Sequence, residues 1–329
     1  MIIIGKNILA KSVQKNNEIR ILLGEKMNFN PQDHVIFEGV IGSQLYGTAT
    51  KDSDLDIRAV CNTPLKVIID PFECFEQKDS GFDEDDKVIY DIGKFFKLCT
   101  DSNPNILELL FIPKSKTIFK NKEWDLILEN RSLFLSKKAK YTFLGYSWAQ
   151  LKKAKVHREW FKNPPKEKPT RKMFGLTDSP IISGEGLQVL SNIKLDLFKE
   201  EFKDEIRREV EYRDTKKRWD DYISWKENRN PARMELEEKY GFDTKSMLHV
   251  FRLLEEGKQL LLNGKIEFPL QNAEELLAIK YGKYSYEEAL EKASNMEKEF
   301  EEWYNISTLP HHTDKKCLTE LYYKIVLGE

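Results

Sequence analysis

One short stretch constrains the fold more than any other: GSQLYG at residues 42–47, followed by SDLDIR at residues 53–58. The apolar run at residues 35–41 in front of it is typical of a buried strand. Behind it, apolar residues at 55, 57 and 59 alternate with the residues between them, which predicts a second strand over 55–60. The stretch therefore connects two strands through a glycine-containing turn.

The residue types in this stretch suit the binding of a metal ion and of phosphate. Asp54 and Asp56 are two residues apart, so on a strand both carboxylates point to one face. Carboxylate oxygens are ligands that Mg²⁺ prefers. Gly42 and Ser43 lie at a strand-to-helix turn, where backbone N–H groups can hold phosphate. Each motif alone is common, as a solvated strand edge or an ordinary turn, but the two in this order favour a functional site.

This combination resembles the signature of the polymerase-β superfamily of nucleotidyltransferases. The signature consists here of Gly42-Ser43, a ten-residue spacer and Asp54-x-Asp56. The resemblance implies a short mixed β-sheet flanked by helices. It also implies two Mg²⁺ (or Mn²⁺) ions, held by these two aspartates and a third carboxylate from a later strand. A nucleoside triphosphate would be the co-substrate, bound at the turn that contains Gly42, Ser43 and Tyr46.

The third carboxylate is expected on a strand predicted at residues 87–92, directly before a helix at 93–100. Asp91 is the candidate for the third metal ligand and for the group that accepts a proton from the attacking hydroxyl. Two alternatives stay open. Asp91 could instead cap the following helix, because aspartate is favoured at that position, or Asp85 or Asp86 could be the ligand.

The segment NPNILELL at residues 103–110 narrows the resemblance to a branch of bacterial and phage nucleotidyltransferases linked to RNA repair. Asn103 suits a helix cap and Pro104 a first helical turn. Glu108 is interpreted as a structural residue at the edge of the core, with contact to the site as the alternative.

Length and composition indicate an α+β protein of two domains. The 329 residues allow a nucleotidyltransferase catalytic domain at 1–131 and a mainly helical domain at 132–329 that completes the nucleotide and acceptor site. The four cysteines lack paired spacing, and neither a signal peptide nor a membrane-length run is visible, which predicts a cytoplasmic protein with no membrane partner. Helices are expected at 7–26, 132–156, 186–212, 213–228, 273–281, 285–305 and 314–327.

The net charge is −2, so any RNA-binding surface must be a local patch. Residues 152–172 hold nine Lys or Arg against two Glu, with Trp160 and Phe161 among them. Cations mixed with aromatic rings suit a phosphate backbone and its bases. A solvated charged loop is the alternative. The candidate nucleic-acid contacts are Lys152, Lys155, Arg158, Arg171 and Lys172.

A helix that Asp243 is expected to cap carries Lys245, His249 and Arg252 on one face. It is similar to a helix that the same branch places across from the catalytic sheet. The resemblance implies that these three side chains contact the phosphates or the nucleotide. A solvated face is the alternative.

These features together predict a metal-dependent nucleotidyltransferase. It would move a nucleoside monophosphate from the triphosphate to an acceptor hydroxyl by a two-Mg²⁺ mechanism, with release of pyrophosphate. The expected acceptor is an RNA 3′ end, with tRNA as one candidate. The alternatives are a protein or small-molecule acceptor, or a catalytically silent protein that binds nucleotides or RNA.

Overall fold

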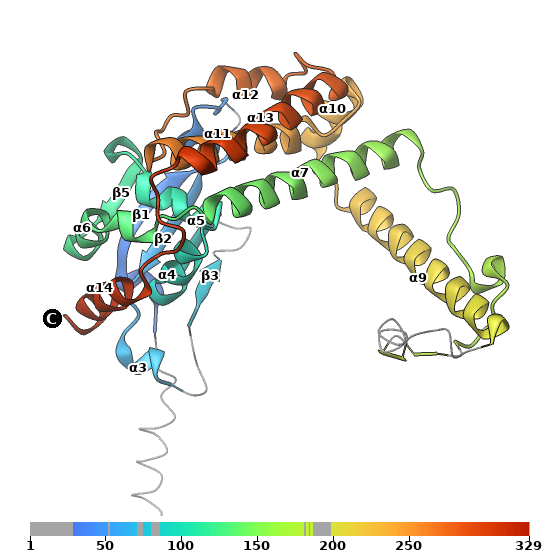
Figure 1. The fold of residues 1–329 in the computed structure, drawn as a ribbon, viewed down its shortest axis with the longest axis horizontal. Helices are drawn as coiled ribbons and strands as arrows, with labels where there is room; N and C mark the ends of the chain where they lie inside the picture. Colours follow the sequence, from blue (N-terminus) through green and yellow to red (C-terminus); the bar gives the residue numbers. More distant parts are fainter. Residues whose placement is uncertain are drawn as a thin grey trace, which may run out of the picture. The chain divides into compact units, whose positions relative to one another are not determined.

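The computed structural model describes residues 29–51, 53–70, 75–79, 86–180, 182–183, 185–186 and 199–328. The helix expected at 7–26 lies outside these residues. So does part of the acidic segment 73–86. Figure 1 shows a sheet with helices beside it, and further long helices, α7 (Ala139–Lys162) and α9 (Glu200–Glu227) among them. The expected α+β class is therefore confirmed.

The chain forms two compact units. The first contains residues 1–146, 252–276 and 295–329, and the second contains residues 147–251 and 277–294. This division differs from the boundary at 131/132 that the sequence suggested. The unit boundaries fall within helices, and the C-terminal residues belong to the same unit as the sheet. Neither feature is accompanied by a local change of sequence composition, so the sequence did not indicate them.

Five strands of the first unit form one mixed sheet in the order β3-β4-β2-β1-β5. β1 pairs antiparallel with β2 and with β5, β2 pairs parallel with β4, and β3 pairs antiparallel with β4. The strands are β1 (Val35–Ile41), β2 (Asp56–Cys61), β3 (Gln77–Asp79), β4 (Asp86–Asp91) and β5 (Thr117–Lys120). The strands expected at 35–41, 55–60 and 87–92 are confirmed to within one residue.

Apolar side chains lie on both faces of the sheet. Ala59, Cys61 and Ile89 form a buried cluster on one face. Elsewhere Phe37 of β1 stacks on Trp124 of α6 (Lys122–Glu129), with ring centroids 4.1 Å apart. Phe95 of α4 (Ile92–Thr100) contacts the same Trp124 ring, with ring centroids 5.2 Å apart. The buried aromatic layer thus fixes α4 and α6 to the sheet.

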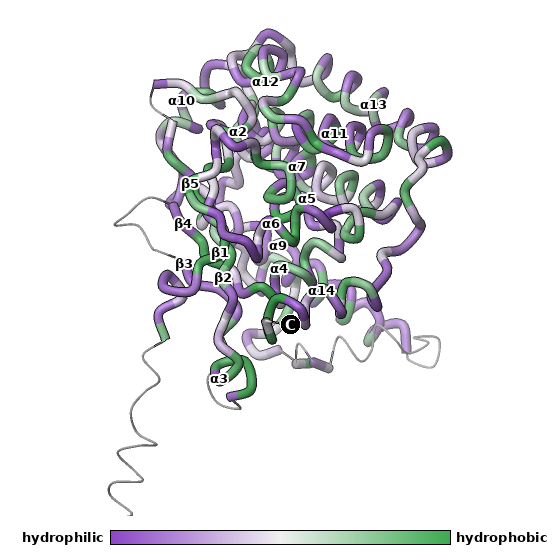
Figure 2. The backbone as a smooth tube through the Cα atoms, turned by 90° about the vertical axis from the view of Figure 1, so that its left-hand side faces the viewer, coloured by the Kyte–Doolittle hydropathy of each residue, from purple (hydrophilic) through white to green (hydrophobic). Residues whose placement is uncertain are grey.

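Short helices complete the first unit, and their ends follow the local sequence. Asn103 accepts a hydrogen bond from the N–H of Asn105 and Pro104 occupies the first turn, as expected. The helices are α2 (Ser43–Tyr46), α3 (Leu65–Ile68), α4 (Ile92–Thr100), α5 (Pro104–Leu107), α6 (Lys122–Glu129) and α14 (Lys315–Leu327). In Figure 2 the α3 segment is coloured as hydrophobic, and Leu65 at its start and Ile69 directly after it are exposed.

The second unit is helical among its described residues. It contains α9 (Glu200–Glu227), α10 (Pro231–Tyr240) and parts of α7 (Ala139–Lys162), α11 (Thr244–Asn263), α12 (Ala273–Lys280) and α13 (Tyr286–Ile306). The sequence predicted a break near residue 212, but α9 is continuous, because no glycine or proline interrupts it. The sequence analysis missed β5 and α10.

None of the helices in the described part of the chain combines the length and the apolar character that a membrane span requires.

The aromatic layer provides a stability test. Trp124→Ala should lower the free energy of unfolding by about 3–5 kcal/mol, because it empties a buried ring site. Phe119→Ala on the edge strand β5, where the ring is 47% exposed, should change it by less than about 0.5 kcal/mol. Urea denaturation followed by circular dichroism measures both. Equal losses would contradict the assigned core.

Candidate active site

The Gly-Ser turn lies against the side chain of Asp56. Gly42 follows β1 with φ +66°, a conformation that favours glycine, and forms the N-terminal end of α2. A Cβ atom at Gly42 would lie 2.1 Å from Oδ2 of Asp56. The turn thus needs glycine both for its backbone angle and for the approach of this carboxylate. As a result, the turn and one motif aspartate meet, as the sequence predicted.

The pairing of three strands brings a second carboxylate to Asp56. Asp56 pairs with Ile41 at the end of β1 and with Asp86 at the start of β4. Residues paired across neighbouring strands point to the same face, so Asp56 and Asp86 are side by side. Asp54 is exposed and precedes β2, which begins at Asp56. The expectation that Asp54 itself lies on the strand is therefore not met.

Asp91 is not part of this group, so the expectation that it supplies the third carboxylate beside Asp56 is not met. It pairs with Cys61, five residues beyond the Asp56–Asp86 pair. At about 3.3 Å per residue that separation is about 16 Å, and an odd number of residues places Asp91 on the other face. Its Oδ2 accepts hydrogen bonds from the N–H groups of Gly93 (2.7 Å) and Lys94 (3.2 Å). Asp91 therefore caps α4.

Asp86, one of the two competitors named from the sequence, takes the place beside Asp56. Asp85 lies outside the described residues. Arg58 is a neighbour that the sequence analysis missed. Its Nη1 donates to the backbone oxygen of Asp86 at 3.0 Å and lies 3.4 Å from the Asp86 carboxylate. Its position two residues after Asp56 on the strand was the available signal, because it places Arg58 on the same face.

Tyr46 of the turn belongs to a buried network of charges. Its hydroxyl donates to Oε2 of Glu108 at 2.9 Å and accepts from Nη1 of Arg252 at 2.9 Å. The same Nη1 lies 3.2 Å from Glu256, and Nη2 donates to Asn105 at 3.1 Å. The guanidinium also lies over the Tyr46 ring, 4.7 Å from its centroid. Glu108 is fully buried, so it is structural as expected, and it also contacts the turn.

The placement of Arg252 corrects the expected cationic face of α11. Arg252 is buried, and its guanidinium binds two carboxylates of the first unit. It does not lie on an exposed surface where anions could reach it. Lys245 is exposed and His249 is half-buried, both in the second unit. Their contact with nucleotide stays a prediction.

Burial controls the protonation of this network. It raises the pKa of Glu108 to about 8 and that of Glu256 to about 7, although the positive charge of Arg252 acts in the opposite direction. Two carboxyl groups face one guanidinium, so protonation of one carboxyl group offsets the excess negative charge. The network thus retains a proton at pH values where exposed glutamates have lost theirs.

The second unit contains another group with metal-ligating side chains: His157, Glu237 and Asp243. Nδ1 of His157 lies 3.7 Å from Glu237 and 3.6 Å from Asp243. However, Arg229 is hydrogen-bonded to Glu237, and Arg233 lies 3.2 Å from Asp243. Two guanidinium groups already neutralise the two carboxylates, so this donor set does not suit a divalent cation.

Asp243 also keeps the role that the sequence gave it. Its Oδ1 accepts the N–H of Ser246 at 2.8 Å and so caps α11. Hydrogen bonds from His157 and Ser246 and the charge of Arg233 outweigh burial and hold the pKa of Asp243 well below its usual range.

The expected nucleic-acid contacts fall into two groups. Lys152, Lys155 and Lys172 are exposed, and RNA contact by them stays a prediction. Arg158, by contrast, forms an ion pair with Glu287 at 2.6 Å, and Arg171 binds both carboxylate oxygens of Glu209 at 3.0 and 2.7 Å. Both arginines therefore stabilise the unit's own packing.

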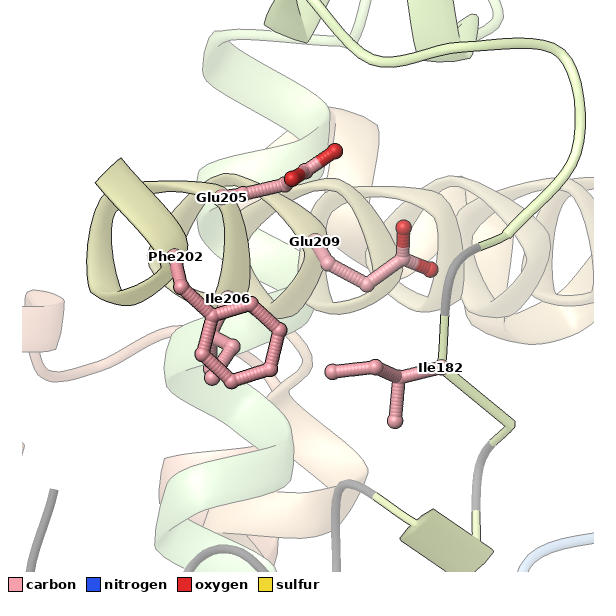
Figure 3. A pocket seen from close by; sticks show the side chains of 5 residues that line it. All are labelled: Ile182, Phe202, Glu205, Ile206 and Glu209. Atoms are coloured by element: carbon pink, nitrogen blue, oxygen red, sulfur yellow. The ribbon is translucent and has the colours of Figure 1, made fainter. Parts of the chain in front are cut away.

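Glu209 lies on α9 beside a small, mostly apolar pocket that Ile182 and Phe202 also line (Figure 3). Arg213 adds a further hydrogen bond to Glu209 at 2.7 Å. Arg171 thus ties the segment that follows α7 to α9 through a carboxylate that is itself buried.

The buried network predicts a pH dependence of stability. Glu108 has an ordinary pKa of 4.5 and a folded-state pKa of about 8, so the folded state binds the proton more tightly. Stability should fall as pH rises from about 4.5 to about 8. Glu108→Gln, which keeps the uncharged shape, should flatten this fall.

Urea denaturation midpoints measured across that pH range give the slope of stability against pH. The matched control is Glu129→Gln, an exposed glutamate of α6, which should keep the wild-type slope. A Glu108→Gln slope equal to that of the wild type would contradict a protonated Glu108.

Comparison with known proteins agrees with this geometry. Residues 11–174 match the profile described as the RNA repair pathway DNA polymerase beta family, a range that includes all five strands. An uncharacterized 38.9 kDa protein in the nrdC-mobD intergenic region of Enterobacteria phage T4 is 29% identical over 128 residues. That match covers 36% of this chain and 38% of the phage protein. No solved structure matches. Through the segment that forms its sheet and its Gly-Ser turn, the chain belongs to the RNA repair pathway DNA polymerase beta family.

Proposed function

We propose that this protein is a metal-dependent nucleotidyltransferase that transfers a nucleoside monophosphate from a nucleoside triphosphate to the 3′ hydroxyl of an RNA. The observation that carries the proposal is the position of the Asp56 carboxylate, which lies against Gly42 and beside Asp86. A glycine turn and adjacent carboxylates on one face form a site for phosphate and for hard cations. The family supports nucleotidyl transfer in RNA repair.

The donor set fits Mg²⁺ or Mn²⁺. Asp56 and Asp86 present carboxylate oxygens from neighbouring strands, and Asp54 precedes Asp56 by two residues. These three aspartates would hold the metal, which when bound neutralises phosphate charge and favours ionisation of the attacking hydroxyl. Arg58 beside Asp86 limits the accumulation of negative charge.

The side chains around the turn have separate tasks in this proposal. Ser43 and the N–H groups of the turn hold the terminal phosphates. Asp86, in place of Asp91, accepts the proton from the attacking hydroxyl. Tyr46 does not touch the substrate; it fixes the turn through its bonds to Glu108 and Arg252. The bond from the α-phosphorus to the acceptor oxygen forms as the bond to pyrophosphate breaks.

RNA is favoured as the acceptor by the family and by the exposed lysines at 152, 155 and 172. The test is transfer of label from each of the four α-³²P-labelled nucleoside triphosphates, with Mg²⁺ or Mn²⁺, onto RNA. Label on RNA from one triphosphate identifies the reaction and the nucleotide together. Label on the protein or on a small molecule would show that this species, and not RNA, is the acceptor. The absence of any transfer would reject the proposal.

Single substitutions distinguish the proposed role of Asp86 as a metal ligand from that of Asp91 as a helix cap. Asp86→Ala should lower turnover by at least about 100-fold, as should Asp54→Ala with Asp56→Ala, because metal ligands are lost. Asp91→Ala should retain turnover but lower the free energy of unfolding by about 1 kcal/mol, since a helix cap is removed.

Label transfer and urea denaturation measure the two effects. The opposite ranking, with Asp91→Ala inactive and Asp86→Ala active at equal folding, would contradict the assigned carboxylates.

A further inference from the structure

The second unit contains a cavity of about 420 Å³ that the catalytic proposal does not use. It is lined by residues of α7, α9 and α10 and of the α9–α10 connection. Binding pockets for small ligands have volumes of about 300–1,000 Å³, so the cavity is large enough for one nucleotide.

Aromatic rings form one part of the wall. His157 and Trp160 stack at 5.7 Å with an interplanar angle of 21°, and Trp225 of α9 lies 5.4 Å from each of them. Tyr222 contacts both tryptophans, at 5.9 and 5.8 Å, and is buried. Trp160 and Trp225 are half-buried and line the cavity.

Fixed and exposed cations form another part of the wall. Arg229 lies over the Trp225 ring, 4.3 Å from its centroid, and is hydrogen-bonded to Glu237. Arg233 is paired with Asp243. These bonds hold both guanidinium groups in place at the cavity. Lys153 is exposed and lines the cavity from α7, on the same helix face as His157 and Trp160.

This combination of groups determines the ligand class. Flat aromatic rings stack on nucleobases, and guanidinium groups stack on nucleobases or donate hydrogen bonds to them. An exposed lysine attracts phosphate. The amides of Asn228 and Asn230 add groups that can hydrogen bond with base edges. The polar, charged lining does not suit an apolar ligand.

We propose that this cavity binds an unpaired base of single-stranded RNA, with the adjoining phosphate at Lys153. The choice of RNA rests on the function proposed above, while the cavity chemistry identifies an unpaired nucleotide independently. Bases in a duplex stay stacked and cannot enter such a cavity. Contact would therefore be restricted to single strands or to the unpaired end of a structured RNA.

The test measures binding with catalysis removed. Full-length protein carrying Asp54→Ala and Asp56→Ala is titrated against a fluorescein-labelled single-stranded RNA of 12 nucleotides, and anisotropy is recorded at several salt concentrations. Lys153→Glu should weaken binding by roughly 5-fold or more and lower the salt slope by about 0.7, the value for one phosphate contact. Lys162→Glu is the matched control, with the same charge change at an exposed lysine on the opposite face of α7.

A second pair of variants measures the contribution of base stacking on Trp160 to RNA binding. Trp160→Leu should weaken binding by roughly 5- to 100-fold, the range for loss of one stacked base. Trp148→Leu changes an exposed tryptophan of the same helix and should have less than about a twofold effect. If Trp160→Leu fails to fold by circular dichroism, the two lysine variants decide the test, because both side chains are exposed.

Three results would overturn the proposal. Equal weakening by Lys153→Glu and Lys162→Glu would indicate a general positive surface instead of a cavity. Duplex RNA bound as tightly as the single strand would exclude base insertion. Free AMP bound as tightly as the RNA would indicate a mononucleotide site. Failure of nucleotidyl transfer is a separate outcome, since the binding pattern is measured in an inactive protein.

Discussion

The pairing of β2 between β1 and β4 is the constraint on which the candidate site depends. One hydrogen-bonded register places Asp56 opposite Ile41 on one side and opposite Asp86 on the other. The first pairing brings the carboxylate against Gly42, and the second brings a further carboxylate to the same face. A shift of one residue would turn Asp56 to the other face, away from the turn. The hydrogen bonds between the strands thus bring the carboxylates of Asp56 and Asp86 together. These carboxylates would repel one another without a metal ion or Arg58 beside them.

Behind the turn, a buried ion network connects segments that are far apart in the chain. Tyr46, Glu108, Arg252 and Glu256 bond to one another in the interior of the first unit. Desolvation of such charges is unfavourable unless each has partners, so removing one member leaves the others uncompensated. The network fixes the turn to α11 at a single position. Its two carboxyl groups share one guanidinium, which explains why burial leaves their pKa values raised.

The second unit uses its positive charge in two ways. Arg158, Arg171, Arg229 and Arg233 form ion pairs with carboxylates of the same unit, and three of the four also lie over aromatic rings. The lysines at 152, 153, 155 and 172 are exposed. A guanidinium suits fixed pairs because it is planar and donates in a fork, whereas a lysine on a flexible stem suits a moving phosphate backbone. The count of basic residues along 152–172 could not distinguish these uses.

The sequence by itself determined the local features. It identified the strands at 35–41 and, to within one residue, 55–60, together with the Gly-Ser turn, the caps at Asn103 and Asp243, the α+β class and the family. The reason is that alternation, capping and turn conformation depend on residues close together in the chain. Tertiary structure decided that Asp86 and not Asp91 lies beside Asp56, and it also decided the burial of Arg252 and the division into units. The physical reason is that parallel strand register and the pairing of buried charges are set between segments tens of residues apart, where no local pattern specifies which partners meet.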